Sequence, residues 1–535
     1  RDVEVSEGID YARFYSTSMK QFAELPDVDI APKGTILVIS PWNFPCAIPI
    51  GGIVAGLAGG NTVILKPATV AAPVAWLFAK AFWDAGVPKE ALQVIITDRE
   101  ALKVLTTAPA VKHIILTGGT DTAQNIARSN PATPLSAETG GKNAIILTAS
   151  GDRDHAIMNI VASAFGNAGQ KCSACSLLLV ERSVYEDKNF QDKLKDAATS
   201  MKVGSVWNPG NVVGPMITNK NDKLLKALEL EKGESWLVPP RFLDKHKYVL
   251  APTVKWGVRP GNYSFRTELF GPMLSVVCIE NLQQGINWVN SLDYGLTSGL
   301  QSLDEGEQKL WKDSIMAGNL YINRGITGAI VNRQPFGGMK LSAFGGGVKA
   351  GGPNYCACFV KITDKLGSTT DYTQSYVKAY EQEFAHARDV NNLYGEQNAF
   401  RYLPLKNMVL RLFPGDNNED AKMIALAARI CHTPLSISFE PGDDRTAALA
   451  SLGCPLKEEA LAGFLKSMKN YERIRTCGAD IPMEMYEEAA RIDKYIATAK
   501  PVKDGRVELI HYIKEQSISF EYHRYGSILE VPSVE

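Results

Sequence analysis

Three short segments carry side chains that could act together on a carbonyl carbon. Cys172 lies in a Gly/Ser-rich turn, GQKCS at residues 169–173, and Glu138 opens the string ETGGK 34 positions earlier. Asn43 lies in SPWNFP, a turn whose prolines restrict the backbone. A thiolate can attack a carbonyl, a carboxylate can act as a base, and an amide can donate a hydrogen bond to the resulting oxyanion. These residue types indicate a thiol-based site that forms an acyl intermediate.

The cysteine taken alone supports other interpretations. A buried structural thiol is the commonest role of an isolated cysteine. Cys172 and Cys175 also form a C-x-x-C pair, but a zinc site needs a second ligand pair, and Cys356 and Cys358 are spaced C-x-C without a neighbouring histidine. A papain-like hydrolase needs a histidine to polarise the thiol, and none of the seven histidines lies in a recognisable motif. We therefore expect no metal site, and the cysteine taken alone favours a structural thiol.

Apolar runs alternate with helix-like segments from the start of the chain, which predicts a doubly wound sheet of parallel strands. Such a sheet binds ligands at the carboxyl ends of its strands, and SPWNFP directly follows the first apolar run. A second α/β unit begins near residue 143 and runs to about residue 331. Expected strands cover residues 34–40, 61–65, 92–97, 113–116, 143–148 and 177–181, and expected helices cover residues 48–58, 71–85, 101–107 and 154–166.

Beyond residue 331 the pattern changes twice. Residues 337–352 contain seven glycines in 16 positions, which predicts an irregular loop. Residues 364–394 are polar and charged, which suits a linker with some helix. From residue 403 the α/β pattern resumes, with strands expected at residues 408–413, 435–439, 507–513 and 517–522, and helices expected at residues 419–432, 457–475 and 483–499.

Composition narrows the class of protein. The 535 residues are 45% hydrophobic and 21% charged, with a net charge of -1, which argues against a disordered chain and against nucleic-acid binding through bulk charge. Nine cysteines are too few for a disulfide scaffold and indicate a reducing compartment, so we expect a cytoplasmic protein. Prolines and glycines interrupt the 32 uncharged residues between Lys33 and Lys66, which predicts a buried core instead of a membrane helix. The residues that follow Arg1 have neither the basic nor the apolar region of a signal peptide, and we expect this sequence to be part of a longer gene product.

The three chemical segments resemble the aldehyde dehydrogenase superfamily. Their order, the spacing from Glu138 to Cys172, KPA at residues 66–68 and ELFGP at residues 268–272 occur where that family places them, over about residues 1–365. The resemblance implies an α/β fold with a Rossmann-type NAD-binding domain at residues 1–138, lacking its first turns. It also implies an α/β catalytic domain at residues 139–330 that carries the nucleophile, followed by a Gly-rich anchor loop and oligomerisation flap at residues 331–365.

The same resemblance assigns roles within the site. It makes Cys172 the nucleophile, places the Asn43 amide and the Cys172 N–H on the oxyanion of a thiohemiacetal, and makes Glu138 the base that activates water to hydrolyse a thioester. NAD is the implied cofactor, bound through Lys66, Thr117, Gly118, Gly119, Glu268 and Phe270. Thr69 stands where the family commonly has a glutamate that repels a 2′-phosphate, so NADP stays open as an alternative.

Further strings resemble L-glutamate-γ-semialdehyde dehydrogenase, also called pyrroline-5-carboxylate dehydrogenase. These strings are INRGITGA at residues 322–329, QPFGG at residues 334–338 and KAGGP at residues 349–353. In that family the residue after the nucleophile and the backbone of the Gly-rich loop bind the substrate α-carboxylate, which implies Ser173, Gly351 and Gly352 here. The implied reaction is NAD-dependent oxidation of L-glutamate γ-semialdehyde to L-glutamate in proline catabolism.

Residues 366–535 resemble the C-terminal region of bacterial proline utilization A, through GEQN at residues 395–398 and EQSIS at residues 515–519. That resemblance implies a bifunctional enzyme whose FAD-dependent proline dehydrogenase precedes residue 1. It implies a C-terminal α/β lid domain without catalytic residues that covers an internal tunnel, a homo-oligomer, and peripheral membrane association of the full-length protein. Two alternatives stay open: a broad-specificity or CoA-acylating aldehyde dehydrogenase, and a catalytically silent scaffold.

Overall fold

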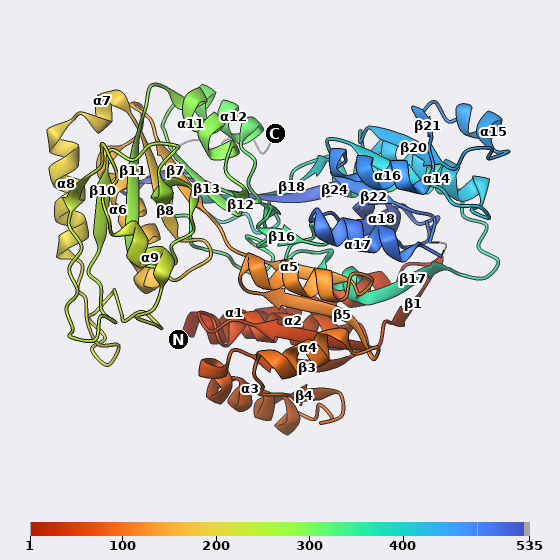
Figure 1. The fold of residues 1–535 in the computed structure, drawn as a ribbon, viewed down its shortest axis with the longest axis horizontal. Coiled ribbons are helices and arrows are strands. Elements are labelled where there is room, and N and C mark those ends of the chain that lie inside the picture. The colour runs from red at the N-terminus through yellow and green to blue at the C-terminus, as the bar shows by residue number, and fades with distance from the viewer. Residues whose placement is uncertain (1, 479, 529–535) are drawn as a thin grey trace.

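The computed structural model describes residues 2–478 and 480–528 of the chain. Their strands form three large sheets, each covered by helices on both faces. Figure 1 shows the nine-stranded and five-stranded sheets side by side, with the six-stranded sheet below them. This arrangement confirms the predicted α/β class, with a Rossmann-type part, a second α/β part and an additional C-terminal α/β part.

The six-stranded sheet belongs to the predicted nucleotide-binding part. Its order is β16-β6-β5-β2-β3-β4, and all neighbours run parallel except β16, which is antiparallel to β6. Ile36 and Val38 pack with α1, α2 and α3, whereas Leu37 and Ile39 pack with α4 and α5, so the centre of β2 is apolar and buried on both faces. The bounds are β2 (Thr35–Ser40), β3 (Thr62–Pro67), β4 (Leu92–Val94), β5 (Val111–Thr117), β6 (Leu135–Glu138), β16 (Ala343–Phe344), α1 (Asp2–Ala23), α2 (Ala47–Ala58), α3 (Ala72–Asp84), α4 (Arg99–Thr107) and α5 (Thr120–Ser129).

The nine-stranded sheet carries the predicted nucleophile. Its order is β18-β24-β14-β13-β7-β8-β11-β10-β9, with α6 and α8 on one face and α11 and α12 on the other. Its strands are β7 (Asn143–Leu147), β8 (Cys175–Glu181), β9 (Ser235–Val238), β10 (Thr253–Trp256), β11 (Met273–Ile279), β13 (Thr297–Gln301), β14 (Asn319–Ile322), β18 (Glu396–Pro404) and β24 (Ile513–Glu521). Its helices are α6 (Arg153–Phe165), α8 (Lys188–Ser200), α11 (Leu282–Asn290) and α12 (Glu305–Ser314). Because β18 and β24 come from beyond residue 365, the C-terminal segment (residues 366–535) is built into this sheet.

The five-stranded sheet lies wholly within the C-terminal segment. Its parallel order, β21-β20-β19-β22-β23, repeats the order β4-β3-β2-β5-β6 of the first sheet. One face packs on α14, and the other packs on α16 and α17. The bounds are β19 (Met408–Arg411), β20 (Leu435–Phe439), β21 (Leu456–Glu458), β22 (Arg473–Arg475), β23 (Ile496–Ala497), α14 (Asn418–Ile430), α16 (Leu461–Ser467) and α17 (Met483–Arg491).

Three secondary-structure predictions for the C-terminal segment are wrong. The helix expected over residues 457–475 is the short α16 between β21 and β22, and the helix expected over residues 483–499 ends with α17, before β23. The strand expected over residues 507–513 is instead α18 (Gly505–Glu508) and the turn η6 (Leu509–Tyr512). The Asp504 side chain accepts the Arg506 N–H and caps α18, a local signal that favours a helix start.

Short strands bring the Gly-rich loop (residues 337–352) between the sheets. β15 (Met339–Lys340) pairs with β12 (Tyr294–Gly295), and β16 joins the six-stranded sheet. The loop ends near β17 (Val360–Asp364), which pairs antiparallel with β1 (Val28–Pro32). The remaining elements are α7 (Arg182–Tyr185), α9 (Asp222–Ala227), α10 (Tyr263–Arg266), α13 (Tyr372–Ala379), α15 (Thr446–Ala450), β25 (His523–Arg524) and β26 (Ser527–Ile528).

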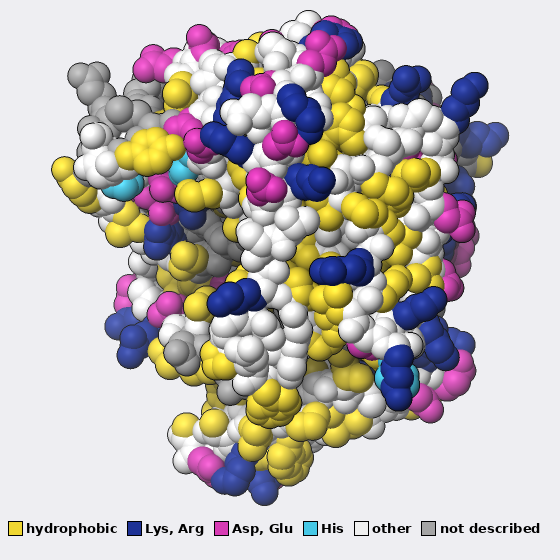
Figure 2. All heavy atoms as spheres, turned by 90° about the vertical axis from the view of Figure 1, so that its left-hand side faces the viewer, with side chains coloured by type: hydrophobic (Ala, Val, Ile, Leu, Met, Phe, Trp, Pro, Cys, Tyr) yellow, Lys and Arg dark blue, Asp and Glu magenta, His cyan; other side chains and the backbone are white. Residues whose placement is uncertain are grey.

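Surface polarity is mixed on the face that Figure 2 shows. Charged side chains of both signs are interspersed there, and hydrophobic side chains gather at the lower end, where Figure 1 places α3. Trp76 and Leu77 of α3 are 51% and 68% exposed. The uncharged stretch before Lys66 forms β2, the SPWNFP turn and α2. Within residues 2–478 and 480–528, no helix has the length and apolar character to cross a bilayer.

Candidate active site

Cys172 lies in the turn between α6 and β8. The chain enters this turn through three consecutive residues with positive φ, namely Asn167 (56°), Ala168 (54°) and Gly169 (66°). Asparagine and glycine tolerate this left-handed conformation, but alanine rarely adopts it, so surrounding contacts must hold the backbone there. A Cβ on Gly169 would overlap the Gly271 carbonyl, which explains the glycine.

Two asparagine side chains fix the backbone around the nucleophile. The Asn143 amide, at the start of β7, donates to the carbonyl oxygens of Cys172 at 2.6 Å and Ala174 at 3.0 Å. The Asn43 amide, from the turn after β2, donates to the Gln170 carbonyl at 3.1 Å. Because a side-chain amide has two N–H donors, Asn43 keeps one for a further acceptor. Sequence reasoning missed Asn143, because an asparagine at a strand start has no distinguishing spacing.

Burial is the largest influence on the Cys172 thiol, and it raises the pKa of that group to about 12. The carboxylates of Glu268 and Glu138 also raise this pKa, whereas the N–H groups of Ser173 and of Cys172 itself lower it. The sulfur is therefore protonated at neutral pH in this state, and attack on a carbonyl requires a base that takes its proton. The two carboxylates are candidates for that base.

Glu138 ends β6, and its surroundings suit proton exchange near neutral pH. Burial raises its pKa to about 8, against the lowering effects of the Lys349 ammonium and the Gly338 N–H. The Gly338 N–H donates to Glu138 Oε2 at 3.2 Å, and Lys349 Nζ donates to the Gly337 carbonyl and to Asn319 Oδ1, the latter at 2.8 Å. The Gly337 carbonyl and the Gly338 N–H belong to one peptide unit. That peptide therefore connects the buried ammonium to the candidate base, a contact that the sequence did not reveal.

The ELFGP segment lies against the ETGGK segment. Glu268 Oε1 accepts the Gly141 N–H at 2.8 Å, and burial raises the pKa of Glu268. A Cβ on Gly141 would lie 2.8 Å from the Cys172 carbonyl oxygen, so glycine is needed where the chain passes beside the nucleophile turn. Phe270, with a φ of 50°, meets the Trp42 ring edge-on, with 5.8 Å between the ring centroids. These contacts bring the ELFGP and SPWNFP segments to one place.

The other predicted cofactor residues lie at the carboxyl ends of β3 and β5. Burial lowers the pKa of Lys66, and no charged group among the described residues acts against it. The Lys66 ammonium therefore has no neutralising partner among those residues. Thr117 ends β5, Gly118 follows, and Gly119 is the N-cap of α5 without a side-chain acceptor. A Cβ on Gly119 would meet nothing closer than 4.0 Å. β3 and β5 lie on either side of β2, and a cation at one strand end with an open helix N-terminus at the other fits the phosphates and ribose of a dinucleotide.

The Gly-rich loop differs from the expectation in the direction of its N–H groups. The Gly351 N–H donates to the Tyr15 hydroxyl at 2.7 Å, and the Gly352 N–H donates to the Lys349 carbonyl at 3.0 Å. In this conformation both donors already have acceptors within the protein. Tyr15 lies on α1, far away in the sequence and fully buried, so no local pattern could indicate the contact. Ser173 is buried directly after Cys172.

The sequence profile described as "Aldehyde dehydrogenase family" matches residues 1–364. This chain belongs to the aldehyde dehydrogenase family. The family predicted from the motifs is thereby confirmed, and the match ends where the C-terminal segment begins.

This aldehyde dehydrogenase is similar to proteins named 1-pyrroline-5-carboxylate dehydrogenase. Those of Geobacillus sp. (strain WCH70) and Bacillus subtilis (strain 168) are 34% and 33% identical, and each alignment covers 66% of this chain and 72% of the relative. A Thermus 1-pyrroline-5-carboxylate dehydrogenase solved with bound NAD is 32% identical with a TM-score of 0.63, covering 68% of this chain and 73% of that one.

Similarity to a longer protein includes the C-terminal segment. The structure of proline utilization A (PutA) from Corynebacterium freiburgense is 37% identical with a TM-score of 0.86, and the match covers 98% of this aldehyde dehydrogenase. The chain spans 54% of the length of that protein.

A cavity of about 1320 Å³ lies where the family region of this aldehyde dehydrogenase meets the C-terminal segment. Its lining includes Leu135 of β6, Gly338 and Gly346 of the Gly-rich loop, Arg473 of β22 and Glu515 of β24. Gly338 lines the cavity, and its N–H donates to the Glu138 carboxylate, so one residue of the cavity wall contacts the candidate base directly.

Proposed function

We propose that this aldehyde dehydrogenase oxidises L-glutamate γ-semialdehyde to L-glutamate in proline catabolism, with NAD as the hydride acceptor. The observation that carries the proposal is the convergence of separate strand ends on one thiol. The Asn43 amide lies on the turn of Cys172, and the Glu138 carboxylate acts on the pKa of its thiol. The relatives named 1-pyrroline-5-carboxylate dehydrogenase support the substrate, because that ring is the cyclised form of the semialdehyde.

The residues of the chain account for the covalent steps. The proton of the Cys172 thiol moves to one of the two carboxylates that act on it, and the sulfur bonds to the aldehyde carbon. The Asn43 amide and the Cys172 N–H donate to the resulting oxyanion. Bound NAD would supply the hydride acceptor, which leaves a thioester on Cys172. Glu138 then takes a proton from water as the water oxygen attacks, and the C–S bond breaks to release the acid.

Cofactor binding rests on residues at the carboxyl ends of β3 and β5, the two strands that flank β2. Lys66 supplies an ammonium without a neutralising charge among the described residues, and Gly119 opens a helix whose first N–H groups suit a pyrophosphate. Glu268 and Phe270 complete the set on the side of the nucleophile. Thr69 begins η1 (Thr69–Ala71) and adds no carboxylate that would repel a 2′-phosphate. We propose NAD as the preferred cofactor, and the assay below compares it with NADP.

Recognition of the substrate carboxylate is assigned to Ser173 and to the Gly351 and Gly352 backbone. Because Gly351 donates to the Tyr15 hydroxyl, a substrate must take over this donor. A carboxylate is a stronger acceptor than a neutral phenol oxygen, so this exchange is favourable. The proposal therefore includes a small rearrangement of the Gly-rich loop when the substrate binds.

We further propose that the chain is the dehydrogenase part of a bifunctional proline utilization A, whose FAD-dependent partner activity lies in another part of the protein. The match over 98% of this chain to such a protein supports the assignment. In this context the cavity beside Gly338 would hold the intermediate between the two sites, covered by the C-terminal segment. A homo-oligomer and peripheral membrane association of the full-length protein stay predictions from the resemblance, and a cytoplasmic location stays a prediction from the cysteine content.

The test uses the purified chain with two aldehydes and two cofactors. Pyrroline-5-carboxylate supplies the semialdehyde and pentanal supplies an aldehyde of similar length without a carboxylate, while absorbance reports the reduced cofactor. Two or three hydrogen bonds to a charged group should favour the semialdehyde by at least about two decades in kcat/KM. Equal kcat/KM values would favour a broad-specificity enzyme. A titratable Cys172 thiol without turnover of either aldehyde would favour a silent scaffold.

A further inference from the structure

The many glycines of the Gly-rich loop leave its backbone with little local preference for one conformation. Gly345, Gly347 and Gly351 have φ values of 103°, 74° and 77°, and Gly346 lies between the first two. Glycine loses more conformational freedom on ordering than any other residue. The same loop contacts Glu138 and carries the N–H groups assigned to the substrate carboxylate. Contacts from outside the loop must therefore hold it in one shape.

One such contact comes from β22 of the C-terminal segment. Arg473 is 5% exposed, and its Nη2 donates to the Gly346 carbonyl at 2.7 Å. Its Nη1 donates to the His511 carbonyl, also at 2.7 Å, and the guanidinium lies 5.6 Å from the centroid of the Tyr495 ring. A planar guanidinium with fixed donors sets both the position and the orientation of the carbonyl that it binds. Arg473 thereby ties the middle of the run of glycines at residues 345–347 to the five-stranded sheet.

A second contact comes from β24, and it has the opposite polarity. Glu515 is buried, and its Oε2 accepts the backbone N–H of Lys349 at 2.6 Å. Its Oε1 accepts the side-chain amide of Asn354 at 2.7 Å, and the same amide lies 3.0 Å from the Tyr402 hydroxyl of β18. The Arg473 guanidinium on a loop carbonyl and the Glu515 carboxylate on a loop N–H thus hold two points, three residues apart, in the second half of the loop. Both charged groups lie outside residues 1–364, the part that matches the family.

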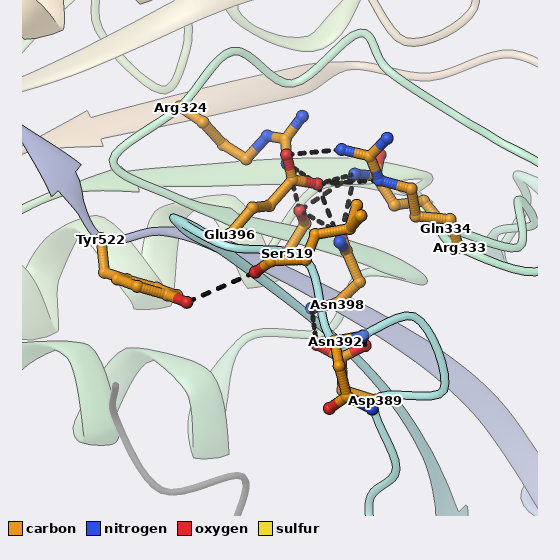
Figure 3. A network of polar contacts seen from close by, with 10 residues as sticks. Arg324, Arg333, Gln334, Asp389, Asn392, Glu396, Asn398, Ser519 and Tyr522 are labelled. Carbon is orange, nitrogen blue, oxygen red and sulfur yellow. Dashed lines mark hydrogen bonds and ion pairs between the residues drawn. The ribbon is translucent and has the colours of Figure 1, made fainter. Parts of the chain in front are cut away.

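The chain before the loop is held from the same side. Figure 3 shows Arg324 and Arg333 pointing toward Glu396 of β18. Arg324 Nη1 and Arg333 Nη2 each lie 2.7 Å from a Glu396 carboxylate oxygen. Gln334, which opens the QPFGG string before the loop, donates to Asn398 Oδ1 at 2.9 Å. The C-terminal segment therefore supports the segment that enters the loop as well as the loop itself.

We propose that Arg473 and Glu515 are positioning residues that set the conformation of the Gly-rich loop and, through it, the preference for an aldehyde that carries a carboxylate. The preference part of this proposal rests on the proposed function; the positioning part does not. On this view the C-terminal segment does more than cover the cavity, because two of its buried charges shape the substrate side of the dehydrogenase site.

Hydrogen exchange of the whole chain without substrate tests the positioning directly. In Arg473→Met and Glu515→Gln, peptides that span residues 345–354 should exchange at least about tenfold faster than in the wild type, because each variant removes or weakens a charged hydrogen bond. Arg473→Lys, which keeps a cation, should restore part of the protection. Wild-type exchange in both variants would overturn the positioning role.

Arg445→Met is the matched control. Arg445 also lies in the five-stranded part, and its guanidinium donates to the backbone carbonyls of Asp416 at 2.6 Å and Phe413 at 3.0 Å. It does not contact the loop. This variant should leave exchange in residues 345–354 unchanged. Faster exchange there in Arg445→Met would mean that general loosening of the C-terminal segment explains the result, and the assignment to Arg473 would fail.

Steady-state kinetics test the effect on substrate preference. In Arg473→Met, KM for the semialdehyde should rise about tenfold or more with little change in kcat, and kcat/KM for pentanal should stay unchanged. Equal losses on both aldehydes would refute the preference role. A wild-type enzyme without preference for the semialdehyde would instead refute the proposed substrate, while the exchange experiment would still decide whether Arg473 and Glu515 hold the loop.

Discussion

The ionisation of Glu138 should be visible in the pH dependence of turnover. Burial raises the pKa of this carboxyl to about 8. A group with that pKa is about one tenth ionised at pH 7 and about nine tenths ionised at pH 9. Because the ionised form is the one that accepts a proton from water, kcat should rise about tenfold between these pH values where thioester hydrolysis limits turnover. The sign follows from the role: a general base works when deprotonated, so activity is lost as pH falls.

The assay combines steady-state rates with rapid mixing across this pH range. In the wild type the midpoint of kcat should lie near pH 8, and Lys349→Met should move it upward because the Lys349 ammonium lowers the pKa of Glu138. Glu138→Gln should still form a burst of reduced cofactor and then hydrolyse the thioester slowly. Complete loss of the burst would assign to Glu138 an earlier step, the activation of Cys172.

A second, partly buried glutamate provides the control. Burial, together with the carboxylates of Glu4 and Asp10, raises the pKa of Glu7 to about 7, yet Glu7 lies on α1 and has no assigned catalytic role. The inflection in kcat should survive in Glu7→Gln and disappear in Glu138→Gln. An inflection that survives in Glu138→Gln refutes the assignment of the base, whatever the absolute rates.

Cys172→Ala should abolish oxidation of both aldehydes, because loss of a nucleophile costs many decades in kcat, while calorimetry should give a Kd for NAD within about twofold of the wild type. Ser173→Ala should lower kcat/KM for the semialdehyde by about tenfold and leave that for pentanal unchanged; equal losses would assign Ser173 to the shape of the turn. Although burial raises it, the hydrogen bond from Arg333 and the charge of Arg324 hold the pKa of Glu396 at about 2. The resulting stabilisation is complete above the pKa of an unfolded glutamate and is lost as pH falls toward 2. Because solvent screens this partly exposed group, Glu396→Gln should lower the free energy of unfolding in urea at pH 7 by about 1–2 kcal/mol, and that free energy should then fall less steeply in acid. If the free energy of unfolding of Glu396→Gln fell with acid as steeply as that of the wild type, the ion pairs of Glu396 would add no stability.

Local sequence patterns predicted the strands that are buried on both faces. The strand expected over residues 435–439 matches β20, and the one expected over residues 34–40 begins one residue before β2. Such strands are mostly apolar over a few consecutive residues, although β20 also contains Ser436 and Ser438, so their signal is local. The sequence also predicted that Asn43 and Lys66 lie near the carboxyl ends of neighbouring strands. The structure has them at one edge of the sheet, because parallel strands end on the same side.

Elements defined by distant partners could not be predicted in the same way. β22 reads Arg-Ile-Arg, and both arginines are buried because carbonyl and carboxylate partners reach them from residues far along the chain. β18 carries Glu396 and Arg401 and is half-exposed, yet it pairs with β24 along its whole length. In these strands the tertiary partner outweighs local propensity.

The residues of the candidate site also differ in whether a local sequence pattern or a distant contact defines them. Cys172, Glu138 and Asn43 could be named as candidates because the order and spacing of these residue types resemble those of the family, and their catalytic roles stay predictions. Asn143, Tyr15 and the residues that hold the Gly-rich loop could not be named, because an asparagine, a tyrosine or an arginine becomes functional only through what it contacts. The direction of the Gly351 N–H is the clearest case: its glycine was expected to leave the donor open to a substrate, but a hydroxyl 336 positions away accepts it. Since a buried N–H must find some acceptor in the absence of substrate, a donor reserved for a ligand needs a replaceable internal partner, and the Tyr15 hydroxyl meets that requirement.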